Sequence, residues 1–159
     1  MTNEQKKIVT FYALLIAAVI FNFLPSMQIQ TVGLIIFFVC FIGLYIARGT
    51  AKKASMMYSH GSYMIKSIWI SSLFFLIGGV FAGVFGDHSI IDGIIDSITQ
   101  GVVIAPDEMN NMMIEYAKSN FVVFLLSLLP SILYLLYRFV RGLRVAIKNS
   151  SINNPGSWF

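Results

Sequence analysis

The chain has 159 residues, of which 57% are hydrophobic and only 11% are charged, and its formal net charge is +4. Soluble domains carry about 25% charged residues, and one soluble core of this length cannot bury so much apolar surface, whereas a bilayer can. The basic residues flank the apolar runs instead of forming one face, which argues against a nucleic-acid partner. The composition therefore predicts a single membrane domain, residues 1–159.

The first half of the chain contains two apolar runs joined by a short turn. Residues 8–24 and residues 31–47 each have about the length of a membrane-spanning helix. Pro25 begins an uncharged turn, because proline disfavours helix at the residue before it, so we expect an antiparallel helical hairpin. Phe23 and Leu24 occupy positions where a signal peptidase needs small residues, which predicts that the first run is retained.

The second half contains two more predicted spans, residues 62–85 and residues 121–137, separated by the only long connection, residues 86–120. In this loop, isoleucines are interleaved with aspartates at a helical spacing, apolar on one side and acidic on the other. This pattern predicts an amphipathic helix that lies flat and caps the bundle. The residues are Ile90, Ile91, Asp92, Ile94, Ile95, Asp96 and Ile98. Pro106 begins a further helix with acidic residues in its first turn. We expect this helix to continue without interruption into the fourth span.

The basic residues indicate how the chain is oriented. Ten of the eleven precede span one, lie between spans two and three or near the start of span three, or follow span four, and only Lys118 lies in the acidic long loop. Since basic residues accumulate on the cytoplasmic side, both termini are predicted to be cytoplasmic. The fold class is thus all-α, an integral membrane four-helix bundle, with an amphipathic helical segment in the external loop between spans three and four.

Small residues in the third span predict close helix packing. Gly79 and Gly83 form a G-x-x-x-G pattern, extended by Gly78, Ala82 and Gly86 at the same spacing. Residues four apart share a helix face, and backbones without Cβ atoms can approach closely. The partner is a second span of this chain or, in a homo-oligomer, a second copy.

The basic residues near the predicted interface are candidate contacts for anions or lipid headgroups: Arg48, Lys66, Arg138 and Arg141. Lysine can instead reach the headgroups along its own aliphatic stem. His60, just before the third span, is a candidate interfacial switch, because histidine titrates near neutral pH. A solvated histidine is the simpler alternative.

Chemistry-bearing groups are otherwise sparse, and no catalytic, cofactor-binding or metal-binding residues are predicted. Met109, Met112 and Met113 could bind Cu(I) through their thioethers, although methionine more often fills apolar gaps. The predicted spans contain no Asp, Glu or His, the groups expected along an ion or proton path. This pattern argues against an enzyme and against an ion-coupled transporter.

Several separated motifs resemble a family of short bacterial inner-membrane proteins of unknown function, whose signature is roughly Y-I-x-R, a spacer, then S-H-[FY]-x-x-x-I-R-T-F-W-I. The matching segments cover nearly the whole chain: Tyr45 to Arg48, Ser59-His60, Ile65 to Ser67, Trp69-Ile70, Tyr137-Arg138, Arg141 to Leu143, Asn154-Pro155 and Trp158. Gly61 stands where the family has an aromatic residue, and Lys66 stands where it has arginine. The family is remotely similar to the four-helix subunit of the chloroplast inner-envelope translocon, which implies a four-helix architecture and a role in a membrane assembly.

Three functions fit this sequence. The first is a non-enzymatic membrane protein that acts through protein or lipid contacts, as a subunit, a scaffold or an envelope-maintenance factor. The second is a small oligomeric channel or transporter, and the third is an immunity or inhibitor protein. A protein partner would bind through the external loop or through the face that carries Gly79 and Gly83.

Overall fold

The computed structural model describes residues 1–22, 24 and 26–152, and this part of the chain is all-helical, with six helices and no strand. Some residues used in the predictions above lie outside the described residues: Phe23, Pro25, Asn154, Pro155 and Trp158. The helices in order are α1 (Asn3–Phe21), α2 (Met27–Thr50), α3 (Met56–Phe85), α4 (Ser89–Thr99), α5 (Pro106–Ser119) and α6 (Phe121–Ile147).

Three of the described helices, α2, α3 and α6, are long and apolar enough to cross a membrane. In their most apolar windows only 17 to 22% of the residues are buried within the chain, so most of this apolar surface needs lipid or another protein to cover it. These helices contain the predicted spans 31–47, 62–85 and 121–137, and they indicate a membrane protein.

Helix α1 is not among these three. It begins with polar and charged residues that include Lys6 and Lys7, and it ends at Phe21 instead of residue 24. The apolar part, residues 8–21, is about 21 Å long at 1.5 Å per residue, which is less than the ~30 Å of a hydrocarbon core. The helix is therefore shorter than the predicted span of residues 8–24, and its apolar part alone is too short to cross a membrane.

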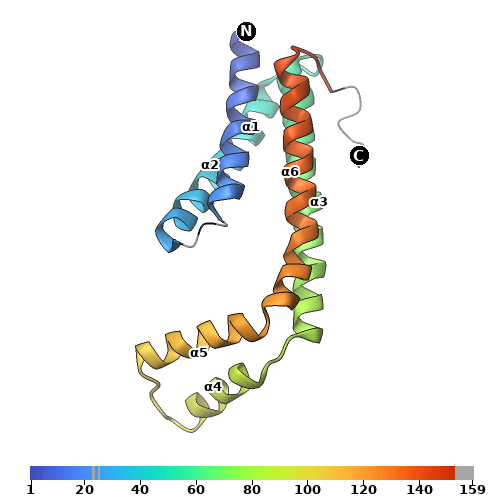
Figure 1. Ribbon diagram of the computed structural model, residues 1–159. Helices are drawn as coiled ribbons and strands as arrows, with labels where there is room; N and C mark the ends of the chain where they lie inside the picture. The colour runs from blue at the N-terminus through green and yellow to red at the C-terminus, as the bar shows by residue number, and fades with distance from the viewer. Residues whose placement is uncertain (23, 25, 153–159) are drawn as a thin grey trace. The chain divides into compact units, whose positions relative to one another are not determined.

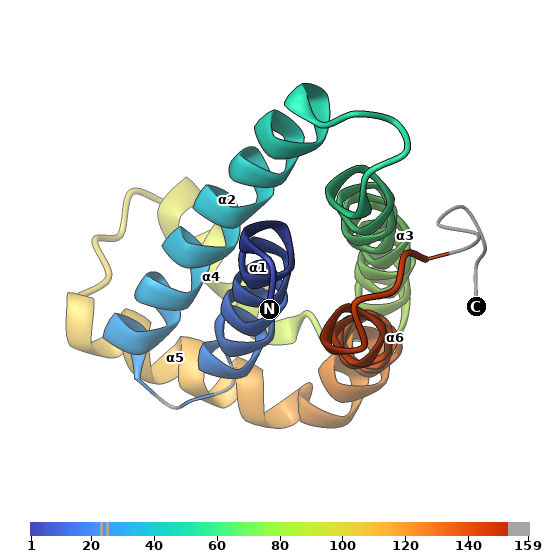
Figure 2. The same ribbon diagram turned by 90° about the horizontal axis from the view of Figure 1, so that it is seen from above.

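The chain divides into two compact units. Unit 1 comprises residues 1–72 and the chain from residue 131 onward, which contain α1, α2, the first part of α3 and the last part of α6. Helices α1 and α2 form the predicted antiparallel hairpin (Figures 1 and 2). The fully buried core draws on all four helices, for example through Leu15, Leu44, Met64 and Phe139.

Helices α3 and α6 lie side by side in unit 1 (Figure 2). Their hydroxyl groups join them. Ser71 Oγ lies 2.6 Å from Ser131 Oγ, and each hydroxyl is also within hydrogen-bond distance of the other residue's carbonyl oxygen, so the two protons are shared among these contacts. Both helices are longer than predicted. Helix α3 begins at Met56 instead of residue 62, and α6 continues to Ile147 instead of residue 137. As a result, Arg138, Arg141 and Arg144, expected after the fourth span, lie on α6 itself, and Lys148 directly follows it.

Unit 2 comprises Leu73–Pro130, with the end of α3, helices α4 and α5, and the start of α6. The expected amphipathic helix is present as α4, and the helix starting at Pro106 is present as α5. The expectation that α5 runs uninterrupted into α6 is wrong, because the helix breaks at Asn120. The Asn120 side chain accepts the Asp87 amide at 2.7 Å and donates to the Asp87 carbonyl at 2.9 Å, which ties this break to the end of α3.

Candidate functional site

Polar side chains buried in unit 1 form a network where α1, α3 and the segment after α6 meet. His60 and Tyr12 are both fully buried, and the Tyr12 hydroxyl lies 3.1 Å from His60 Nδ1. On the other side of the ring, Nε2 lies 2.9 Å from the Ser150 carbonyl oxygen. A carbonyl only accepts, so Nε2 carries a proton and a neutral ring accepts at Nδ1 from the tyrosine. His60 therefore links three segments instead of lying at a solvated interface.

Neighbouring side chains tie the same segments together. The Ser59 hydroxyl donates to the Ile152 carbonyl at 2.9 Å and accepts the Ile152 amide at 3.0 Å. Near the start of α1, Gln5 Nε2 donates to the carbonyls of Ala146 and Ile147 at 3.0 and 2.9 Å. These are carbonyls of the last helical turn, which have no partner within the helix. Gln5 thus closes the C-terminal end of α6.

Replacing Tyr12 by phenylalanine is expected to lower the free energy of unfolding by about 1–3 kcal/mol, because it leaves the buried Nδ1 of His60 without a donor. The fall in melting temperature is about 2–4 °C per kcal/mol for a chain of this size. It can be followed with a thiol-reactive dye at Cys40, the only cysteine, which is 4% exposed. Tyr137→Phe is the matched control, since Tyr137 is 54% exposed. Equal melting of the two variants would contradict the role of the network.

Arg138 is fully buried, although it follows the predicted fourth span and was expected to contact headgroups. Its guanidinium carbon lies 3.7 Å from the centre of the Tyr63 ring, and its Nε donates to Ser67 Oγ at 3.1 Å. The Ser67 hydroxyl in turn donates to the Tyr63 carbonyl at 2.7 Å. This geometry combines a cation–π contact with a directed hydrogen bond, and it joins α6 to α3.

The other predicted headgroup contacts have different surroundings. Arg48 is half-buried, with its guanidinium carbon 5.2 Å from the centre of the Tyr58 ring, and Lys66 is also half-buried. Arg141, by contrast, is exposed. The structure therefore does not give the four predicted contacts one common environment.

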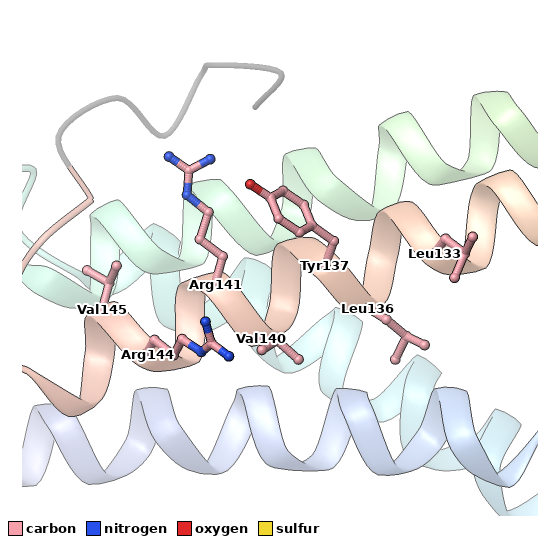
Figure 3. A pocket seen from close by; sticks show the side chains of 7 residues that line it. All are labelled: Leu133, Leu136, Tyr137, Val140, Arg141, Arg144 and Val145. Carbon is pink, nitrogen blue, oxygen red and sulfur yellow. The ribbon is translucent and has the colours of Figure 1, made fainter.

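Arg141 lines an open groove of about 640 Å³ on α6 (Figure 3). Its lining residues recur every three or four positions and so share one helix face: Leu133, Leu136, Tyr137, Val140, Arg141, Arg144 and Val145. The groove is apolar at the Leu133 end, and two guanidinium groups lie one turn apart at the other end. An amphiphile with an anionic head matches this distribution.

The glycine face of α3 belongs to unit 2. At Gly79 and Gly83 a Cβ atom would meet nothing within 4 Å, and both residues are exposed. The close approaches are at Gly78, where a Cβ would lie 2.9 Å from the Ser127 carbonyl carbon, and at Gly86, where it would lie 2.6 Å from the Ala82 carbonyl oxygen. The tight contact of α3 with α6 is thus made by Gly78, one residue before Gly79, and not by the Gly79–Gly83 pair.

The buried contacts around His60 and around Arg138 include residues that the predictions from the sequence do not name as site residues, above all Gln5, Tyr12, Tyr63 and Ser67. A signal was available for two of them. The buried face of α1 runs Gln5, Ile8, Tyr12, Leu15 and Val19, a helical stripe in which Gln5 is the polar exception and Tyr12 carries a hydroxyl. A polar group within an apolar stripe needs a buried partner. Ser67 and Tyr63 gave no comparable signal.

Comparisons of the chain with protein-family models, with curated proteins and with solved structures find no match.

Proposed function

We propose that the chain is a multi-pass protein of a bacterial inner membrane that crosses four times with both termini in the cytoplasm. We further propose that it acts through lipid or protein contacts, as a subunit, scaffold or envelope-maintenance factor, and not by catalysis. The resemblance to short bacterial inner-membrane proteins fits this proposal.

The contacts of α1 support the proposal of four crossings. Its start bonds to the end of α6 through Gln5, and α1 is antiparallel to α2. If α2 crosses the bilayer, α1 must return through the same depth to bring Gln5 beside Ile147. Gln5 and Ile147 thus lie together at one end of unit 1, and the basic residues that flank the apolar runs support a cytoplasmic location for that end.

The observation that carries a contact function is that polar side chains of these helices, which a pore would need along its lining, are engaged within the chain. Ser71 bonds to Ser131, and Ser72 and Ser127 donate to backbone carbonyls one turn earlier, at 2.9 and 2.7 Å. Asn22 likewise donates to the Ala18 carbonyl at 2.7 Å. The outward surface is apolar instead, with α2 side chains such as Ile35, Val39 and Ile42 more than half exposed. These features favour a protein that acts through its outer surface, and they argue against a conducting pore through its interior.

The topology is tested by labelling single cysteines in a Cys40→Ala background with a maleimide that cannot cross the membrane. Lys52, Asp107 and Lys148 are exposed sites on the three segments concerned. We expect Asp107→Cys to react from outside intact cells, and Lys52→Cys and Lys148→Cys to react only after the membrane is opened. Reaction of Asp107→Cys and Lys148→Cys from the same side would contradict four crossings.

The contact function is tested by purifying the full chain from native membranes in mild detergent and identifying what copurifies by mass spectrometry. We expect a protein or a lipid in a fixed ratio to the chain. The alternatives, transport and catalysis, are tested by reconstituting the purified chain into vesicles and measuring solute flux and substrate turnover. Specific solute flux or substrate turnover by the chain alone would overturn the proposal.

A further inference from the structure

We propose that the α6 groove binds one anionic phospholipid, with its phosphate on Arg141 and Arg144 and an acyl chain along Leu133, Leu136 and Val140. This inference rests on the proposed function and names the ligand of one contact surface. Neither arginine has a hydrogen-bond or carboxylate partner among the described residues. Both are exposed and one helical turn apart. In Figure 3 Arg141 extends away from α1 and Arg144 towards it, so binding one phosphate with both guanidinium groups requires a rotamer change, which exposed side chains make readily.

The charge of unit 1 selects an anion. Ten of the eleven Lys and Arg residues belong to this unit, but only one of the seven carboxylate side chains, Glu4. Glu4 is already engaged, because its Oε1 accepts the Met57 amide at 2.7 Å. The positive charge at the groove is therefore not neutralised by acidic side chains of the same unit, and an external anion would be attracted to it.

The apolar half of the groove selects a lipid over a free phosphate or a soluble anion. Leu133 lies about 12 Å along the helix axis from Arg141, at 1.5 Å per residue. Its side chain is 55% exposed and that of Val140 is 38% exposed, so both offer apolar surface that an acyl chain would cover. Tyr137, which is 54% exposed, lies between the two halves of the groove. An aromatic ring with a polar tip is typical of the headgroup level of a membrane.

The test uses the full chain in a neutral detergent and measures lipid binding by native mass spectrometry. The probes are phosphatidylglycerol, phosphatidylcholine with the same acyl chains, and inorganic phosphate. We expect the wild-type chain to bind one phosphatidylglycerol in preference to phosphatidylcholine, and phosphate not to displace it. The double variant Arg141→Gln/Arg144→Gln should bind phosphatidylglycerol about 30-fold more weakly, from about 1 kcal/mol for each basic residue near the headgroups.

The matched control is Lys52→Gln/Lys53→Gln, which removes the same charge from two exposed residues between α2 and α3. It should leave phosphatidylglycerol binding within about threefold of wild type. A second variant, Val140→Trp, fills the apolar half while both arginines remain, and should also weaken binding. If the arginine double variant does not fold, Arg144→Gln and Val140→Trp carry the test.

Three results would overturn the inference. Equal loss in the arginine and lysine double variants would mean that only overall charge matters. Displacement by inorganic phosphate would mean a free-anion site, and equal binding of phosphatidylcholine would mean that the arginines do not select the headgroup. None of these results bears on the cysteine labelling or the copurification above, so failure of the lipid site is distinguishable from failure of the proposed function.

Discussion

Replacing Arg138 by alanine is expected to destabilise unit 1 by about 2–4 kcal/mol, because it removes a cation–π contact and a charged hydrogen bond from a fully buried site. Tyr63 would lose the group stacked on its ring, and Ser67 would lose its donor. At about 2–4 °C per kcal/mol, the melting temperature falls by roughly 4–16 °C. The thiol-reactive dye at the buried Cys40 reports this transition.

Arg141→Ala is the matched control, since Arg141 lies on the same helix but is exposed, and exposed substitutions usually stay within about 0.5 kcal/mol. Arg138→Lys should also destabilise, because lysine lacks both the planar group that stacks on Tyr63 and the Nε–H that reaches Ser67. Equal melting of Arg138→Ala and Arg141→Ala would show that Arg138 does not hold α6 against α3.

Replacing Gly78 by alanine is expected to destabilise unit 2 by about 1–3 kcal/mol, the usual cost of overpacking. The new Cβ would overlap the Ser127 backbone, which cannot move aside as a flexible side chain could. Helices α3 and α6 would therefore separate locally. We expect hydrogen exchange of residues 121–130, followed by mass spectrometry, to accelerate about 5- to 150-fold, at tenfold per 1.4 kcal/mol.

Gly79→Ala is the neighbouring control, because a Cβ at Gly79 meets nothing within 4 Å in the chain. In a monomer it should stabilise the helix by about 0.5–1 kcal/mol, the propensity difference between alanine and glycine. Faster exchange in Gly79→Ala than in Gly78→Ala would contradict the packing described here. Loss of an oligomer in Gly79→Ala, seen as a change in mass, would instead support a contact between copies at this face.

The sequence predicted those elements whose signal is local. The helical spacing of isoleucine and aspartate was sufficient to predict the amphipathic helix α4, and Pro106 marks the start of α5. The break at Asn120 has no such signal, because the Asn120 side chain bonds to Asp87, 33 residues earlier in the chain. A local pattern cannot contain this contact, and so the prediction of one continuous helix was wrong.

The surroundings of Arg138 and Gly78 could not be predicted for related reasons. An arginine at the end of an apolar run is usually interfacial, and its burial here depends on Ser67, 71 residues away. The third span carries two overlapping small-residue stripes, one through Gly78 and one through Gly79. Which stripe meets α6 depends on the rotation of α3 about its own axis. Tertiary packing fixes that rotation, whereas spacing alone does not.

The hydrogen bonds that join His60 and its neighbours to the end of the chain have a consequence for the order in which the chain folds. Ser150, whose carbonyl bonds to His60, is synthesised 90 residues later, and Ala146, which bonds to Gln5, is synthesised 141 residues after its partner. Until those later residues have been synthesised, these polar groups must bond to water or to another protein. These hydrogen bonds therefore form only after translation has passed residue 152. In nascent chains stalled earlier, Gln5, Ser59 and His60 would lack their C-terminal partners.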